Sequence, residues 1–336
     1  MDPFEGYIAA KPGQVCRLKR SLYSFKQASR QWNLELTTRL LEFGFSQSPH
    51  DTCLFLKHSG NDFLALLVYV DDSLLTGTSE DNLRAVKQYL DRFFTIKDLG
   101  DAKYSLGLEL ARSGHGLHIT QHKYLEDILV DTAMENATPV STPVPSGLQL
   151  TSDAGSLLPF LDKYRRVVGR LLYLRFTRPD ISFHVQQLSQ FLQHPRTSHW
   201  DVALHIIQYL KGSRSLGLFF PARNTLALST YSDTSWASCL DSRRSIIGFC
   251  VFLGSSLVSW KTKKQAIVLA LPLKQNIAAW HQLCVNCSGF HIYFMTFVFQ
   301  FLSLFRFGVT IRPHFTLRPI LSSTSAPNIL TLIVTW

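Results

Sequence analysis

The sequence predicts an α+β protein, because stretches with helical periodicity alternate with stretches rich in β-branched and aromatic residues. Apolar residues at helical spacing occur over residues 32–43 and 164–192. Residues 66–77 and 226–260 instead have the composition of strands joined by polar turns. The 336 residues exceed the roughly 150 residues of one average domain, so we expect two domains.

Two adjacent carboxylates stand in the predicted hairpin at residues 66–77, which reads LLVYVDDSLLTG. Its β-branched and aromatic residues favour strands, and Asp71 and Asp72 suit the turn between them. Two carboxylates fixed on one turn repel each other, so sharing a divalent cation such as Mg²⁺ or Mn²⁺ stabilises them. An ordinary aspartate-containing turn is the alternative that these residues leave open.

A helix is predicted on each side of this hairpin. The upstream helix should end at Gly44, a residue type that favours helix C-termini, and Ser79 is the expected N-cap of the downstream helix. We expect one apolar stripe of each helix to face a core. The two stripes are Trp32, Leu36, Leu40 and Phe43, and Leu83, Val86, Leu90 and Phe93.

Residues 138–160 are rich in Pro, Ser, Thr and Gly, which predicts a linker between two domains. Beyond them, two apolar stripes at helical spacing predict core-facing helices, and residues 226–260 predict three strands. The stripes are Tyr164, Val167, Val168, Leu171 and Leu172, and Ile181, Val185, Leu188 and Leu192.

The net charge of +10 comes almost entirely from the residues after Asp241, which include no acidic side chain. The balanced remainder gives little independent support for nucleic-acid binding. No signal-like apolar segment follows Met1 and the six cysteines are scattered, so we expect an intracellular setting, cytoplasm or nucleus. Polar residues interrupt the apolar stretch at 290–307, so we expect no membrane span.

Stretches along most of the chain resemble the Pol polyprotein of Ty1/copia-type LTR retrotransposons. They are, in order, VCRLKRSLYSFKQASRQW, LLVYVDDSLLTG, IKDLGDAKYSLGLEL, YRRVVGRLLYL, TRPDIS, LSQF, YLKGS, YSDTSWASCLDSRRSIIGFCVFLG and SWKTKKQ. Each alone is weak, but their order and spacing together are highly specific. The resemblance extends from the N-terminus to Ala266–Val268 and implies a reverse transcriptase followed by a ribonuclease H.

The resemblance also implies a domain layout. It assigns a partial reverse-transcriptase palm and thumb to residues 1–137, a linker to 138–160 and a helical connection to 161–223. A truncated and degenerate ribonuclease H-like β-sheet would occupy residues 224–287. Residues 288–336 do not resemble the family and are expected to form an unrelated apolar tail.

By this resemblance, Tyr69 to Asp72 are the YxDD of the polymerase palm, and Asp71 and Asp72 are catalytic residues that bind Mg²⁺. Phosphoryl transfer by two metal ions needs further carboxylate ligands. The family carries a third Asp on a strand that we expect to fall before Met1. No acid upstream of Asp71 lies at the end of an apolar strand, so we expect this chain to be inactive as a polymerase.

The segment YSFKQASR is similar to the family segment that lines the nucleotide pocket. It implies nucleotide-binding roles for Tyr23, Lys26 and Arg30, the cations meeting dNTP phosphates, and no other small-molecule cofactor. The family usually has Gly-Leu where this chain has Ser24 and Phe25. Without the family context, solvated cations at a helix start are an equally good interpretation.

The ribonuclease H region departs further from the family pattern. Asp233 in YSDTSW matches the first catalytic acid of the family. Lys274 stands where the family usually carries Glu, and no acid follows Asp241. Because a cation at that position repels metal ions, we expect this activity to be lost.

Three interpretations of function follow from these motifs. The first is an RNA-directed DNA polymerase fragment that acts on an RNA template and a DNA primer. The alternative is a catalytically dead nucleic-acid-binding module that retains the palm and connection and grips RNA–DNA hybrid. The third is a decayed insertion whose ancestral activities were reverse transcription and ribonuclease H. The decayed insertion is favoured, because the family's upstream Asp is expected to fall before Met1 and Lys274 stands where the family usually carries Glu.

Overall fold

The computed structural model describes residues 27–265, with gaps at 50, 61, 70–71, 95, 146, 149, 226 and 236, and the backbone of residues 316–320 and 330–335. Contacts divide the described residues between Leu99 and Gly100 into two parts, which we call unit 1 and unit 2. Both units combine helices with antiparallel sheets, which confirms the predicted α+β class. Among the described residues, no helix is both long and apolar enough to cross a membrane.

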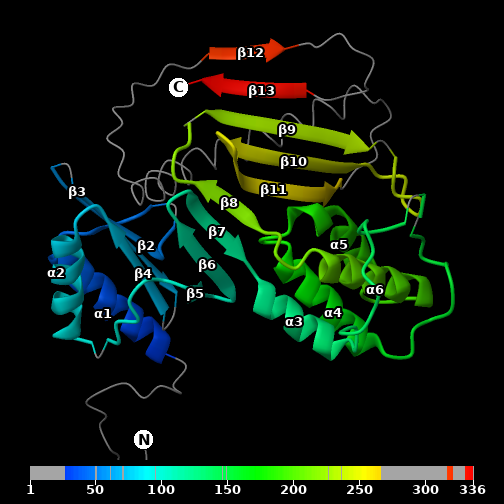
Figure 1. Ribbon diagram of the computed structural model, residues 1–336, viewed down its shortest axis with the longest axis horizontal. Helices are drawn as coiled ribbons and strands as arrows, with labels where there is room; N and C mark the ends of the chain where they lie inside the picture. Colours follow the sequence, from blue (N-terminus) through cyan, green and yellow to red (C-terminus); the bar gives the residue numbers. More distant parts are fainter. Residues whose placement is uncertain are drawn as a thin grey trace, which may run out of the picture. The chain divides into compact units, whose positions relative to one another are not determined.

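Unit 1 is a four-stranded antiparallel sheet of order β1-β2-β3-β4 with two helices (Figure 1). Its elements are α1 (Ala28–Glu42), β1 (Ser46–Gln47), β2 (Leu54–Ser59), β3 (Asp62–Tyr69), β4 (Asp72–Gly77) and α2 (Glu80–Asp91). The predicted order of helix, hairpin and helix is therefore confirmed, although α1 begins four residues before the predicted stripe.

The central strand β3 is anchored in the core of unit 1 through every second residue. Leu64, Leu66 and Val68 pack in one cluster with residues of both helices, including Leu40 and Val86. Side chains alternate across a strand, so these three share one face. Burial of that face fixes which residues of the strand point toward the helices, because a slip of one residue would expose all three.

Both predicted helix caps are present in unit 1. The Ser79 hydroxyl accepts a hydrogen bond from the Asn82 backbone N–H at 3.4 Å and so caps α2. Gly44, with φ of +92°, follows α1, and the Gly44 and Phe45 N–H groups donate to the Leu41 and Leu40 carbonyls. This pair of bonds is a Schellman motif, which a residue with positive φ favours.

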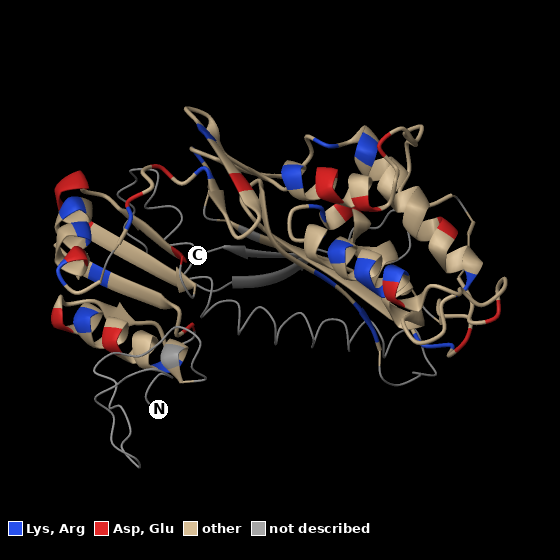
Figure 2. Cartoon of the chain, turned by 90° about the horizontal axis from the view of Figure 1, so that it is seen from below, with Lys and Arg blue, Asp and Glu red and all other residues tan. Residues whose placement is uncertain are grey.

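Acidic and basic residues are interspersed along the helices (Figure 2). On α1, Arg39 lies 2.8 Å from the Glu35 carboxylate and 3.0 Å from the Glu42 carboxylate. These pairs lie at the surface, where solvent screens them, so each contributes little to stability. They do, however, engage two of the acids that precede the hairpin.

Unit 2 contains the remaining described elements. The first sheet has the order β5-β6-β7-β8 and the second the order β11-β10-β9-β13-β12 (Figure 1). The strands are β5 (Tyr104–Ser105), β6 (Leu108–Ser113), β7 (Gly116–Thr120), β8 (Leu218–Pro221), β9 (Leu228–Ser235), β10 (Ile246–Leu253), β11 (Ser256–Lys264), β12 (Thr316–Ile320) and β13 (Leu330–Thr335). The helices are α3 (His122–Asp131), α4 (Leu161–Leu174), η1 (Pro179–Ile181), α5 (Ser182–Leu188), η2 (Ser189–Phe191) and α6 (Thr197–Gly212).

Strands β9, β10 and β11 match the three strands predicted between residues 226 and 260. Strands β12 and β13 come from the segment expected to be an unrelated tail. Their backbones pair with each other, and β13 pairs with β9. The other residues of that segment lie outside the described part of the chain.

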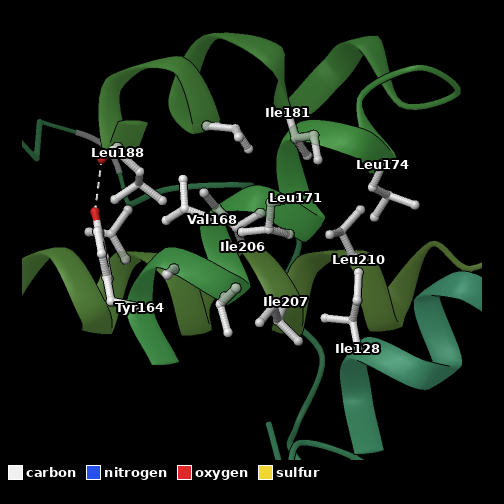
Figure 3. Packing of buried hydrophobic residues seen from close by; sticks show 14 of the residues in the cluster. Ile128, Tyr164, Val168, Leu171, Leu174, Ile181, Leu188, Ile206, Ile207 and Leu210 are labelled. Carbon is white, nitrogen blue, oxygen red and sulfur yellow. Dashed lines mark hydrogen bonds between the residues drawn. The ribbon is translucent and has the colours of Figure 1, made fainter. Parts of the chain in front are cut away.

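The four α-helices of unit 2 share one hydrophobic core (Figure 3). Ile128 of α3, Leu171 of α4 and Ile206 of α6 are fully buried in it. Tyr164 is also fully buried, and its hydroxyl donates a hydrogen bond to the Leu188 carbonyl at 2.9 Å. Helix α3, which we assigned to the partial reverse transcriptase, thus packs with helices that we assigned to the connection.

Replacing Leu171 with Ala should destabilise unit 2 by about 2–5 kcal/mol, because the side chain is fully buried and its removal leaves a cavity. Urea denaturation followed by circular dichroism measures the change in the free energy of unfolding. Leu157→Ala is the matched control, since Leu157 is 60% exposed and its truncation should change stability by less than about 0.5 kcal/mol. Equal effects of the two substitutions would contradict the packing shown in Figure 3.

The segment 138–160, which we predicted to be a linker, lies within unit 2 and is hydrogen-bonded to α6 and to the residues just before it. Its carbonyl oxygens accept hydrogen bonds from side chains of α6 and the residue before it. These side chains are Arg196, Ser198, His199 and His205. The Leu158 and Thr197 N–H groups add backbone bonds to the Pro195 and Ser156 carbonyls. The segment therefore follows one helix closely, and the division between units falls at Leu99 instead.

His199 connects this segment to the start of α6. The buried imidazole accepts a hydrogen bond from the Arg196 N–H at Nδ1, and its Nε2 lies 3.0 Å from the Thr151 carbonyl, to which it donates. The ring also stacks on Phe191 with 3.9 Å between centroids. Burial lowers the pKa of His199, although the bond to Thr151 partly opposes this. The geometry requires the neutral ring, because Nδ1 must accept.

The depressed pKa of His199 predicts a loss of stability at acid pH. The folded state favours the neutral ring, so the stabilisation is complete above the unfolded pKa of about 6.5 and is lost as pH falls from there through the folded pKa. Urea unfolding of unit 2 at a series of pH values measures this loss. His199→Gln should weaken the pH dependence in that window, leaving the contribution of His184, whose pKa burial also lowers, whereas the same change at exposed His194 should leave the full dependence in place.

Candidate functional site

The predicted carboxylate hairpin is formed by β3 and β4. Their register pairs Tyr69 with Asp72, so residues 70 and 71 alone connect the two strands. Asp71 itself lies outside the described residues. Asp72 is exposed, and so is Tyr69, at 56%. Both stand at the tip of the hairpin, next to Val68, which is buried in the core.

The opposite end of this hairpin is closed by a polar network that the sequence did not reveal. The Asp62 carboxylate accepts hydrogen bonds from the Thr78 hydroxyl at 3.1 Å and the Asn82 amide at 2.9 Å. The Phe63 N–H donates to the Thr78 hydroxyl. No local spacing pattern signals this contact, because its members are 16 and 20 residues apart in the chain.

The other described acids that precede the hairpin are held away from its tip or engaged elsewhere. Asp62 and Tyr69 are the ends of the eight-residue strand β3, which places them roughly 23 Å apart at about 3.3 Å per residue. The Asp51 carboxylate accepts from the Cys53 N–H at 2.9 Å. Glu35 and Glu42 pair with Arg39 on α1. Within the part of the chain that the structure describes, no three His, Cys, Asp or Glu residues form a group able to hold a metal ion.

The structure describes only one of the three predicted nucleotide-binding residues. Arg30 lies in the first turn of α1 with an exposed side chain, a position from which a guanidinium can reach an anion in solvent. Tyr23 and Lys26 lie outside the described residues. The structure therefore gives the position of one of the three.

The predicted ribonuclease H acid lies on β9. Asp233 is exposed and pairs with Gly248 of β10, which in turn pairs with Thr262 of β11. These three residues form one row across the sheet, so their side-chain positions share a face. Lys274 lies outside the described residues.

The chain matches a family model described as reverse transcriptase (RNA-dependent DNA polymerase) over residues 1–146. It is 42% identical over 255 residues to the retrovirus-related Pol polyprotein from transposon RE2 of Arabidopsis thaliana, which covers 76% of this chain and 18% of that polyprotein. It is also 30% identical over 263 residues to the putative transposon Ty5-1 protein of Saccharomyces cerevisiae, covering 78% of this chain and 85% of that protein. This chain belongs to the Ty1/copia-type retrotransposon Pol family.

A further relative of this Pol-family chain is an uncharacterized mitochondrial protein of Arabidopsis thaliana, 39% identical over 204 residues. That match covers 60% of this chain and 84% of the relative. The chain spans less than a fifth of the length of the RE2 polyprotein, and no solved structure matches it. The predicted family is confirmed, and with it a retrotransposon reverse transcriptase segment that contains the Asp71–Asp72 hairpin.

Proposed function

We propose that this chain contributes two carboxylates, Asp71 and Asp72, to the metal site of an RNA-directed DNA polymerase that uses Mg²⁺. The register of β3 and β4 carries the proposal, because it leaves only two residues between Tyr69 and Asp72. Asp71 falls in this short turn and Asp72 begins β4. Carboxylate oxygens are the hard ligands that suit Mg²⁺, so the residue types fit the ion.

The protein part of this mechanism is the anchoring of the strands that lead to and from the two acids. Leu64, Leu66 and Val68 hold β3 in the core, and the Asp62 network closes the far end of the hairpin. Strands anchored in this way favour a preorganised position for Asp72 at the start of β4. When bound, a pair of Mg²⁺ ions would activate the primer 3′-hydroxyl and neutralise the leaving pyrophosphate.

We further propose that residues 1–336 retain this share of the site without completing it. The family supplies a third Asp from a strand upstream of this stretch. The engaged positions of Glu35, Glu42, Asp51 and Asp62 support the view that none of them substitutes for it. In this proposal the ancestral partners are an RNA template, a DNA primer and their hybrid.

Supporting roles complete the proposal. Tyr23, Lys26 and Arg30 would contact the incoming nucleotide, the two cations through charge-assisted bonds to phosphate. Asp233 would be the first acid of the ribonuclease H-like sheet. The exposed positions of Arg30 and Asp233 are compatible with these roles.

The test is primer extension by a chimera that joins residues 1–336 to the upstream fingers and palm segment of a family member, including its Asp. We expect extension that depends on divalent metal and is lost in Asp71→Asn and in Asp72→Asn. Asp81→Asn is the matched control, because the Asp81 side chain is 89% exposed on α2, away from the hairpin tip. Extension that survives both hairpin substitutions would refute the proposal.

A further inference from the structure

A cysteine and a lysine meet at one end of the second sheet of unit 2. The loop between β9 and β10 brings Cys239 to Lys264, the last residue of β11, so that Nζ lies 2.9 Å from Sγ and donates a hydrogen bond to it. Lys264 also donates to Gln190 of η2 at 2.9 Å. The loop itself is closed by backbone bonds from Arg243 N–H to the Cys239 carbonyl and from Cys239 N–H to the Arg244 carbonyl. Three elements thus hold the sulfur and the amine together.

The surroundings of this pair favour a thiolate. Burial raises the pKa of Cys239, but the hydrogen bond from Lys264 and the nearby polar groups of Ser242 outweigh it and leave the pKa below its ordinary value. The neighbouring acid Asp241 is engaged, since its carboxylate accepts hydrogen bonds from the Ser152 N–H and hydroxyl. Cys239 as a residue is half-buried, so it is not sealed in a core.

The other two cysteines that the structure describes have the opposite surroundings. Cys53 is exposed as a residue. Partial desolvation of its thiol, followed by the nearby Asp51 carboxylate, nevertheless raises its pKa. Burial also raises the pKa of Cys250. A thiolate is the nucleophilic form of cysteine, so reactivity within this set should follow the lysine contact rather than exposure.

We propose that Cys239 and Lys264 form a peroxide-responsive pair, in which oxidation of the sulfur leads to a covalent sulfur–nitrogen bond between the β9–β10 loop and β11. The inference is independent of the polymerase proposal. It rests on the 2.9 Å contact and on the way the loop, η2 and β11 fix both groups.

The chemistry balances with hydrogen peroxide as the only oxidant. The Cys239 thiolate attacks one peroxide oxygen and the O–O bond breaks, which gives sulfenic acid and hydroxide; the sulfur loses two electrons and the peroxide gains them. The hydroxide takes a proton from the Lys264 ammonium, forming water and a neutral amine. The amine nitrogen then attacks the sulfur, the S–O bond breaks, and the hydroxyl leaves with an amine proton as a second water.

Lys263 and Lys264 provide a matched pair of variants. Strand alternation places their side chains on opposite faces of β11, since Lys263 pairs with Ile247 and Lys264 with Ile246. Arginine at either position keeps the positive charge but lacks a nucleophilic amine at neutral pH, because its guanidinium stays protonated. Lys264→Arg therefore separates stabilisation of the thiolate from formation of the bond.

The experiment treats the full chain with hydrogen peroxide and maps its peptides by mass spectrometry, with and without dimedone to trap sulfenic acid. We expect a Cys239–Lys264 cross-linked peptide that has lost two hydrogens and that dithiothreitol separates. Without peroxide, iodoacetamide should alkylate Cys239 about tenfold faster than Cys53 at neutral pH. Lys263→Arg should leave the cross-link unchanged, Cys239→Ser should abolish it, and Lys264→Arg should abolish it while dimedone still labels Cys239.

Several outcomes would overturn the inference. Sulfenic acid that accumulates at Cys239 in the unaltered chain without the cross-link would show that the amine does not react. Alkylation of Cys53 before Cys239 would show that the lysine contact does not activate the sulfur. Equal loss of the cross-link in Lys263→Arg and Lys264→Arg would show that the bond does not depend on the observed pair.

Discussion

A polypeptide of residues 1–336 should extend a DNA primer at least about a thousandfold more slowly than the chimera that carries the family's upstream Asp. Asp71 and Asp72 would hold a metal ion through one turn only, and no described acid before them is placed to assist. Loss of one electrostatic element of such a site typically costs several kcal/mol of transition-state stabilisation. Single-nucleotide addition to a labelled primer on an RNA template, measured at equal protein concentrations, gives the ratio.

The comparison needs a control for binding, because weak binding of primer and template would also slow extension. Titration of labelled hybrid with each polypeptide separates the two causes. If the chain alone extends the primer and Asp71→Asn removes that activity, the site is complete without the upstream Asp and our proposal is wrong. If neither polypeptide extends the primer although both bind hybrid, the hairpin does not retain its share of the site.

The same polypeptide should fail to cleave the RNA strand of an RNA–DNA hybrid, at a level about a thousandfold below a family member whose sequence keeps the Glu. By the family resemblance we expect Lys274 at the position of that Glu, and no acid follows Asp241 within residues 1–336. An incomplete carboxylate cage holds its ion weakly. Cleavage of a labelled hybrid in the presence of Mg²⁺ is the measurement.

Contaminating nuclease is the main source of error in this assay, and two variants address it. Asp233→Asn removes the proposed acid, whereas Asp241→Asn removes a carboxylate that bonds to Ser152 instead. Cleavage that persists in both variants comes from a contaminant. Mg²⁺-dependent cleavage that disappears in Asp233→Asn and survives in Asp241→Asn would show an active ribonuclease H in this chain.

Much of unit 1 could be predicted from its sequence because its signals are local. The hairpin follows from strand-forming residues on both sides of two aspartates, and each cap follows from a single residue, Ser79 or Gly44. The network of Asp62, Thr78 and Asn82 could not be predicted, since it depends on the register of strands that local spacing leaves open. The order of short motifs was enough to predict the family, since the motifs are spread over the chain from the N-terminus to about residue 268.

The sequence by itself predicted the β3–β4 hairpin with a helix on each side, the core-facing helices between residues 164 and 192, the strands β9 to β11 and the membership of the Pol family. Only the tertiary structure decided how distant segments combine: β7 pairs with β8 across about a hundred residues, α3 shares a core with α4 to α6, and residues 138–160 follow α6. The proline-rich composition of that segment suggested a linker, but its carbonyl groups accept hydrogen bonds from side chains at and just before a helix that lies later in the chain. The physical reason is that composition and periodicity report the backbone preference of each segment, whereas hydrogen-bond partners and the burial of apolar faces depend on residues far away in the sequence.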